Sequence, residues 1–159
     1  MRKHDGSIMN INETVQKLGV KCKDLLPLHS ITGCDSVSYP FGKGKASAVS
    51  LLLKRNLYLE PLCDMNAQEE DVLKAGTNFL ASLYGSAQVS DLNSLRYQVF
   101  SKKKDPPKIK TLPPTNAAAA EHIRRAHLQT LIWYAADQMG PPDVDISKYG
   151  WKLDAHNVP

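Results

Sequence analysis

Apolar residues recur every three or four positions in several separate stretches of the chain, which is the period of an amphipathic helix. These stretches predict about six or seven helices, within residues 12–19, 24–32, 45–56, 66–85, 90–100 and 116–140. One short apolar run, Ile8 to Ile11, is strand-like but has no partner strand in the sequence. We therefore expect a mainly α protein built as a helical bundle.

Short polar residues and glycines mark where these helices begin and end. The expected N-caps, whose side chains accept a hydrogen bond from the first turn, are Asn12, Asn66, Ser90 and Thr115. The expected helix ends, where glycine can adopt the left-handed backbone conformation that stops a helix, are Gly19, Gly33, Gly85 and Gly140. The core-facing residues expected in the three middle helices are Ala46, Val49, Leu52, Leu53, Val72, Leu73, Phe79, Leu80, Leu83, Leu92, Leu95 and Val99.

Residues 101–114 interrupt the helical pattern with four prolines and five lysines. Proline cannot continue a helix and lysine prefers water, so we expect a basic linker that packs weakly or is disordered. The chain then divides into residues 1–100, the linker 101–114, and residues 115–159 with a long helix and an aromatic tail.

The composition allows one domain with a real core, because 42% of the 159 residues are hydrophobic. No run of about 18 apolar residues occurs, and the first residues lack the apolar centre of a signal peptide. These features predict a soluble, intracellular chain with no membrane partner, either nuclear or cytoplasmic. Cys22, Cys34 and Cys63 form no CxxC pair, so we expect reduced thiols.

The formal net charge of +4 belongs to one segment. The run "SKKKDPPKIK" carries +4 by itself, and the rest of the chain is balanced. Its lysines form a candidate secondary basic patch for an anionic partner such as DNA: Lys102, Lys103, Lys104, Lys108 and Lys110. On charge alone, a solvated linker is the better interpretation.

The stretch "PFGKGK" forms a corner between two expected helices. Glycines permit turn angles and close approach to a surface, and the free amides of the second helix favour an anion such as phosphate. This layout is typical of a helix-hairpin-helix, although an ordinary turn with two solvated lysines fits equally well. The candidate DNA-binding residues are Phe41, Gly42, Lys43, Gly44, Lys45 and Ala46.

Other chemistry-bearing residues favour structural roles when taken alone. A single carboxylate such as Asp35 binds Mg²⁺ poorly, and Asp24 lies about three helical turns away. His122 and His127 are five residues apart, which puts them off a shared helix face and argues against zinc. The aromatic residues Trp133, Tyr134 and Trp151 either stack on bases or belong to a core. The arginines Arg124 and Arg125 are expected on a solvated face.

The segment "ITGCDSVSYPFGKGKASAV" resembles the flap endonuclease and related structure-specific 5′ nucleases. In those enzymes a Gly-(Cys or Ser)-Asp-Tyr element precedes a Gly-Ile-Gly helical hairpin, beside a PIN-like α/β core. The resemblance implies that Asp35 corresponds to a ligand of one of two Mg²⁺ ions. It also implies that Phe41 to Ala46 holds a duplex backbone, often through a bound potassium ion.

The match is closer to a group of large animal proteins linked to mobile elements, which carry an LHALTGCDTTSAFFGKGK-like signature. Here that signature is "LHSITGCDSVSYPFGKGK", and the later blocks "LPPTNAAAAEHIRRAHLQTLIW" and "YGWKLD" follow in matching order. Ser36 replaces the usual tyrosine, Lys43 replaces an apolar residue, and the amino-terminal sheet with the other carboxylates is missing. The resemblance implies a carboxy-terminal remnant of a PIN-like nuclease domain.

Three functional hypotheses follow. The first is a non-catalytic chain that binds the DNA backbone weakly and without sequence preference through the hairpin. The second is a metal-dependent nuclease completed by further sequence or by a partner. The third is a helical module that binds other proteins through the long helix.

Overall fold

The computed structural model describes residues 10–152 apart from residues 56, 87–90 and 106. Every regular element in this part of the chain is helical, which confirms the mainly α class. The α-helices are α1 (Ile11–Leu18), α2 (Leu25–Ile31), α3 (Lys45–Lys54), α4 (Glu69–Leu83), α5 (Leu92–Ser101) and α6 (Asn116–Tyr134). Short 3-10 helices lie at Gly19–Asp24, Glu60–Cys63, Ile109–Thr111 and Ile146–Tyr149. The strand-like run begins outside the described residues, and its last residue, Ile11, is helical.

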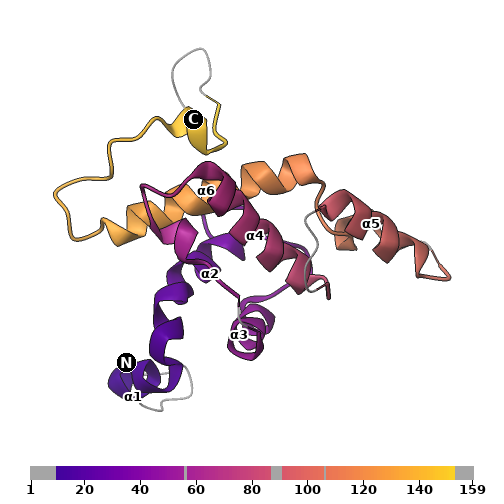
Figure 1. Cartoon of the computed structure of the whole chain (residues 1–159), viewed down its shortest axis with the longest axis horizontal. Helices are drawn as coiled ribbons and strands as arrows, with labels where there is room; N and C mark the ends of the chain where they lie inside the picture. Colours follow the sequence, from indigo (N-terminus) through magenta and orange to yellow (C-terminus); the bar gives the residue numbers. More distant parts are fainter. Residues whose placement is uncertain (1–9, 56, 87–90, 106, 153–159) are drawn as a thin grey trace.

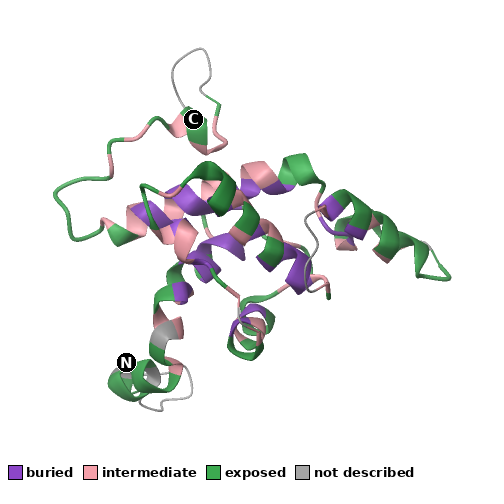
Figure 2. Ribbon diagram, in the orientation of Figure 1, coloured by how far each residue is buried: buried purple, intermediate pink, exposed green. Residues whose placement is uncertain are grey.

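The long helix α6 lies at the centre of the body and packs on α2 and α4 (Figure 1). Ile31 of α2, Phe79 of α4 and Ile123 of α6 are all completely buried. Buried residues gather along these three helices, whereas α1 and most of α5 extend from the body with exposed faces (Figure 2). The core therefore forms where three helices meet, since each buries one apolar stripe against the others.

Helices α4 and α6 approach closely at Gly76. A Cβ atom added to this buried glycine would lie 2.6 Å from Cγ1 of Ile123. Glycine usually weakens a helix relative to alanine. At this position it has a packing role, because only a residue without a side chain allows α4 and α6 to cross so closely. Periodicity along α4 gave no sign of this role, because the partner atom belongs to a helix far along the chain.

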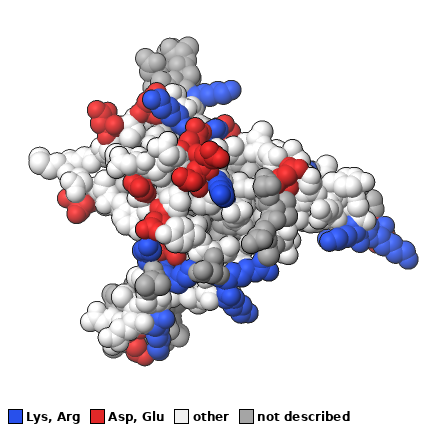
Figure 3. Space-filling model, in the orientation of Figure 1, with Lys and Arg blue, Asp and Glu red and all other residues white. Residues whose placement is uncertain are grey.

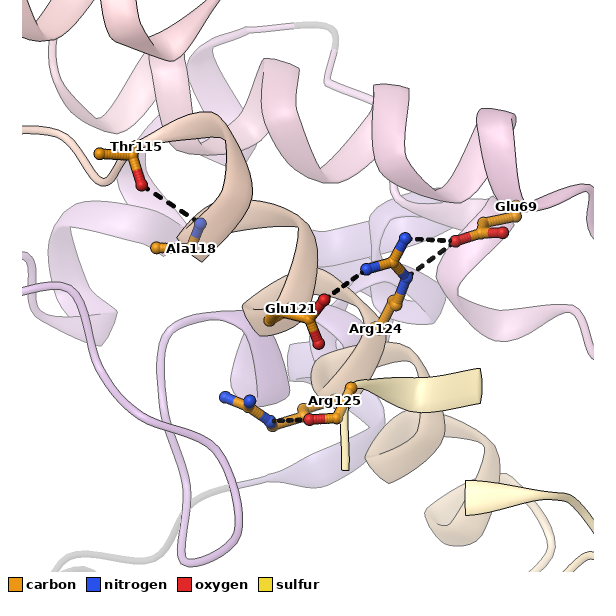
Figure 4. Close-up of polar contacts among 7 residues, drawn as sticks. Glu69, Thr115, Ala118, Glu121, Arg124 and Arg125 are labelled. Carbon is orange, nitrogen blue, oxygen red and sulfur yellow. Dashed lines mark hydrogen bonds and ion pairs between the residues drawn. The ribbon is translucent and has the colours of Figure 1, made fainter. Parts of the chain in front are cut away.

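Two arginines of α6 bind residues of neighbouring segments (Figure 4). Arg124 binds Glu69 of α4 and Glu121 of its own helix, with each ion pair 2.7 Å long. Arg125 donates from Nε to the carbonyl oxygen of Gly150 at 2.9 Å. Both side chains are only partly exposed, so the expectation of a solvated face is wrong.

The helix caps agree only in part with the sequence. Thr115 caps α6, since its hydroxyl accepts from the Ala118 amide at 3.3 Å (Figure 4). The predicted N-caps Asn12 and Asn66 are wrong. Asn10 caps α1, and α4 follows Gln68 without a side-chain cap. Ser90 lies outside the described residues, and the carboxylate of Asp91 accepts from the amides of Asn93 and Ser94 in the first turn of α5. A cap depends on where the backbone leaves the helix, which neighbouring packing decides.

Glycines with positive φ lie at or after the ends of three helices, as the sequence predicts, at Gly19, Gly33 and Gly85. The end predicted at Gly140 is wrong, because α6 stops at Tyr134. In α3 the apolar face is also displaced. Ala48 and Leu52 are buried, while Leu53 is 53% exposed and Ala46 faces water.

The basic linker packs more firmly than expected at its second half. Lys102, Lys103 and Lys104 are exposed, but Leu112 and Pro113 are buried. The guanidinium of Arg96 donates to the carbonyl oxygen of Pro113 at 2.6 Å. This end of the linker therefore belongs to the packed body, and the three-segment division of the chain stays a prediction.

Candidate nucleic-acid interface

The corner predicted from the sequence is the last part of a longer connection. Helix α2 ends at Ile31 and α3 begins at Lys45, so residues 32–44 join them. The connection is folded: the backbone N–H and C=O groups of Cys34 and Val37 bond to each other, and Val37 is buried. It therefore holds the corner at a defined place.

Gly33 brings the two ends of this connection together. Its φ is +101°, and an added Cβ would lie 2.4 Å from Cβ and 2.8 Å from Cα of Tyr39. Only glycine permits both this backbone angle and this approach. The Tyr39 side chain is consequently held at the surface, where it is 75% exposed.

The corner itself is a β-turn. The amide of Lys43 donates to the carbonyl oxygen of Pro40 at 3.1 Å, and Gly42 has φ of +72°. A positive φ at the third residue is the requirement of a type II turn. A Cβ on Gly42 or Gly44 would meet no atom within 4 Å, so this part of the chain leaves the corner open to an approaching surface.

The ammonium of Lys45 binds the end of α2. It donates to the carbonyl oxygens of His29 at 3.2 Å and Gly33 at 2.5 Å, and lies 3.4 Å from the Thr32 hydroxyl. A cation suits this place, because the carbonyl end of a helix carries partial negative charge. Lys45 thus has acceptors within the chain.

Lysines and aromatic rings from distant segments meet beside the turn. The Lys110 ammonium lies 4.3 Å from the centre of the Phe41 ring. The Lys43 ammonium lies 4.7 Å from the centre of the Tyr84 ring, at the end of α4. Phe41, Tyr84 and Lys110 line a hollow of about 270 Å³, together with Tyr39, Ile109 and His122, and Lys43 lies beside it; we call this hollow the basic groove.

His122 fixes the floor of the basic groove. Its Nε2 donates to the carbonyl oxygen of Ile31 at 2.8 Å, so the neutral ring accepts from the Ser38 hydroxyl at Nδ1, 3.2 Å away. Burial lowers the pKa of His122 below its usual value. His127 bonds instead to the Asp64 carbonyl oxygen at 3.2 Å. Each histidine therefore links α6 to another segment.

The described residues do not fit a two-metal site. Asp35 is exposed, and no three His, Cys, Asp or Glu side chains in this part of the chain converge as metal ligands. Asp24 is buried, one of its oxygens lacks a hydrogen-bond partner, and burial raises its pKa. Magnesium-dependent cleavage needs several convergent carboxylates, and the described residues bring no such group together.

The aromatic residues of the long helix and the tail pack against the chain. The Trp133 ring lies 5.2 Å from the His29 ring, and the Tyr134 hydroxyl donates to the Lys23 carbonyl oxygen at 3.0 Å. Trp151 lies under the guanidinium of Arg125 at 5.4 Å. These contacts support the packing interpretation over base stacking for these three residues.

The remaining lysines of the basic run lie elsewhere. Lys102, Lys103 and Lys104 follow α5 directly, and cationic side chains project from the turn beyond that helix, on the right of Figure 3. They are exposed, as is Lys108. The run therefore divides into an outlying cluster and one lysine, Lys110, that belongs to the groove.

A larger hollow, of about 890 Å³, carries mixed charge and suits an anion poorly. Its wall includes the carboxylates of Glu60, Asp64 and Asp71, and the ammonium groups of Lys23 and Lys74. Lys23 already lies 3.1 Å from Glu60. Carboxylates outnumber cations there, so the smaller basic groove is the better candidate for a phosphate ligand.

Comparisons with known proteins add no relative: no family model matches the chain, and no curated protein or solved structure is significantly similar to it. None of the helices in the described part is long and apolar enough to span a bilayer.

Proposed function

We propose that this chain binds nucleic acid weakly and without sequence preference, through phosphate contacts at the basic groove. One observation carries the proposal: Phe41 of the corner lies against Lys110 of the basic run, so the two candidate regions form one surface. Lysines and backbone amides contact phosphates, whereas sequence is read at base edges. The open space beside Gly42 and Gly44 lets a backbone approach these groups.

The resemblance to the structure-specific 5′ nucleases supports the same function. Under this proposal α2, the connection and α3 correspond to their helix-hairpin-helix, and the chain is a non-catalytic, carboxy-terminal remnant of a PIN-like domain. The alternative, an active nuclease, requires further carboxylates from another chain or from additional sequence.

Protein binding through the long helix has less support. Apolar side chains of α6 are buried and therefore not available to a partner, among them Ile123, Leu128 and Leu131. Trp133, a side chain of α6 that stays partly exposed, already contacts His29 of α2.

Replacing Lys43 and Lys110 together by glutamate is expected to weaken DNA binding by at least ~10-fold, because two attractive phosphate contacts become repulsive. The slope of log affinity against log salt should fall by about 0.9 for each phosphate that is no longer neutralised. Fluorescence anisotropy of a labelled DNA across a salt series measures both quantities. Thermal unfolding checks that the double variant remains folded.

Lys74→Glu is the matched control, since this lysine is exposed on α4 and does not line the basic groove. It should change binding little. If the double variant still binds and replacement of Lys102, Lys103 and Lys104 abolishes binding, the site is the outlying cluster and the proposal is wrong.

Purified chain supplied with Mg²⁺ or Mn²⁺ is expected to leave flap, nicked and single-stranded DNA uncut. The physical reason is that the described residues bring no group of three or more His, Cys, Asp or Glu side chains together as metal ligands, and a single exposed carboxylate such as Asp35 leaves such an ion mostly hydrated. Gel analysis of end-labelled substrates measures this. Cleavage that disappears in Asp35→Ala would establish the active nuclease instead.

A further inference from the structure

We propose that the basic groove selects single-stranded nucleic acid over duplex by accepting an unpaired base against Tyr39. This inference rests on the proposed function, because it names the form of nucleic acid bound at the same site. It depends on a separate set of side chains, the exposed apolar ones.

Tyr39 is the side chain best placed to stack. It is 75% exposed and lines the basic groove. Within the described residues its side chain forms no hydrogen bond or ring contact, unlike Phe41 and Tyr84, whose rings lie under lysines. Gly33 holds its backbone in place, so the ring is presented at the surface with little backbone freedom to lose on binding.

A second exposed apolar residue lines the same hollow. Ile109 is 75% exposed, in the 3-10 helix that also contains Lys110. Such a side chain offers an apolar contact for the face or edge of a base. Apolar surface left in water beside cationic groups is the combination that single-strand binding proteins present, with aromatic rings for bases and positive charge for the backbone.

The size of the hollow favours one base over a helix. Its volume of about 270 Å³ lies just below the range of typical small-molecule pockets, so it admits a planar group of nucleobase size. A duplex keeps its bases stacked inside and presents only base edges and backbone. It can therefore touch Lys43 and Lys110 without ever placing a base against Tyr39.

The charges at the basic groove favour a single strand of nucleic acid over an apolar protein segment. Lys43 and Lys110 stand at the groove, and His122 at its floor is uncharged at neutral pH because burial lowers its pKa. No carboxylate lines the groove within the described residues. An apolar protein segment would leave both ammonium groups unused, whereas a single strand supplies a phosphate and a base together.

Competition between strand forms tests this inference. A labelled thymidine oligonucleotide of about 12 nucleotides and the duplex of the same length are titrated by anisotropy at equal salt. We expect the single strand to bind at least ~5-fold more tightly, and Tyr39→Ala to weaken it by about 5- to 150-fold, as removal of one base stack does. Tyr39→Phe keeps the ring and should retain the affinity.

Tyr97→Ala is the matched control, because Tyr97 on α5 is 71% exposed and does not line the groove. It should leave affinity unchanged. Equal or tighter duplex binding that is insensitive to Tyr39→Ala overturns the single-strand inference and leaves the backbone-binding proposal standing. Absence of binding to both forms overturns both.

Discussion

Gly76→Ala and Ile123→Ala are each expected to destabilise the chain, while the double variant should be more stable than the sum of the two effects predicts. The Gly76→Ala change places a methyl group 2.6 Å from the Ile123 side chain. Overpacking of this kind costs about 1–3 kcal/mol. Truncation of the fully buried Ile123 costs about 2–5 kcal/mol, through reduced burial and the cavity left behind.

The double variant separates packing from helix propensity. When Ile123 is reduced to alanine, the space it leaves receives the new methyl group, so the two changes compensate by about 0.5–3 kcal/mol. Urea unfolding monitored by circular dichroism gives each free energy of unfolding, provided the m-value is unchanged.

Leu53→Ala is the control for truncation of an aliphatic side chain, since Leu53 is 53% exposed on α3. It should change stability by about 0.5 kcal/mol or less. Simple additivity of Gly76→Ala and Ile123→Ala would mean that the two residues do not touch, which contradicts the close crossing of α4 and α6.

Gly33→Ala is expected to cost about 3 kcal/mol or more, and Gly42→Ala only about 1–2 kcal/mol. Both glycines have positive φ, at +101° and +72°, which costs any other residue conformational strain. At Gly33 the new Cβ would also lie 2.4 Å from Tyr39, against atoms of its backbone and Cβ that no rotamer change can move. At Gly42 the same atom meets open space.

The two substitutions form a matched pair, because they differ mainly in the surrounding space. Thermal and urea unfolding compare their stabilities. If Tyr39 accepts an unpaired base as inferred above, Gly33→Ala should also weaken single-strand binding, since it displaces Tyr39. Equal destabilisation by the two variants would show that the approach of Gly33 to Tyr39 contributes nothing.

Local rules predicted the helices well, because the signals for them lie within a few residues. The apolar period of α4 identified Val72, Phe79, Leu80 and Leu83 as buried residues, and they are. Thr115 was identified as a cap for the same reason, since its partner amide is only three residues away. Where a cap or a helix end depends on how the chain enters the core, as at α1 and at the end of α6, the local signal failed.

Much of the candidate site was beyond the reach of local rules. The sequence singled out the glycine corner, the lysine run and Asp35, but as separate features. Tyr39 and Tyr84 were given no role, because nothing near them in sequence marks them as groove residues. A useful sign was present at Gly33, since a glycine within a folded loop indicates a close approach, but its partner was not evident.

The sequence by itself determined the helical class, the approximate extent of each helix and the glycine corner at residues 40–45, because periodicity, capping and backbone freedom act over short distances. Only the tertiary structure decided which face of α3 is buried and that Arg124 and Arg125 join α6 to other segments. It also decided that Lys45 binds the end of α2 while Lys110 lies against Phe41. These contacts join residues far apart in the chain, and their energies depend on distances that exist only once the core has formed.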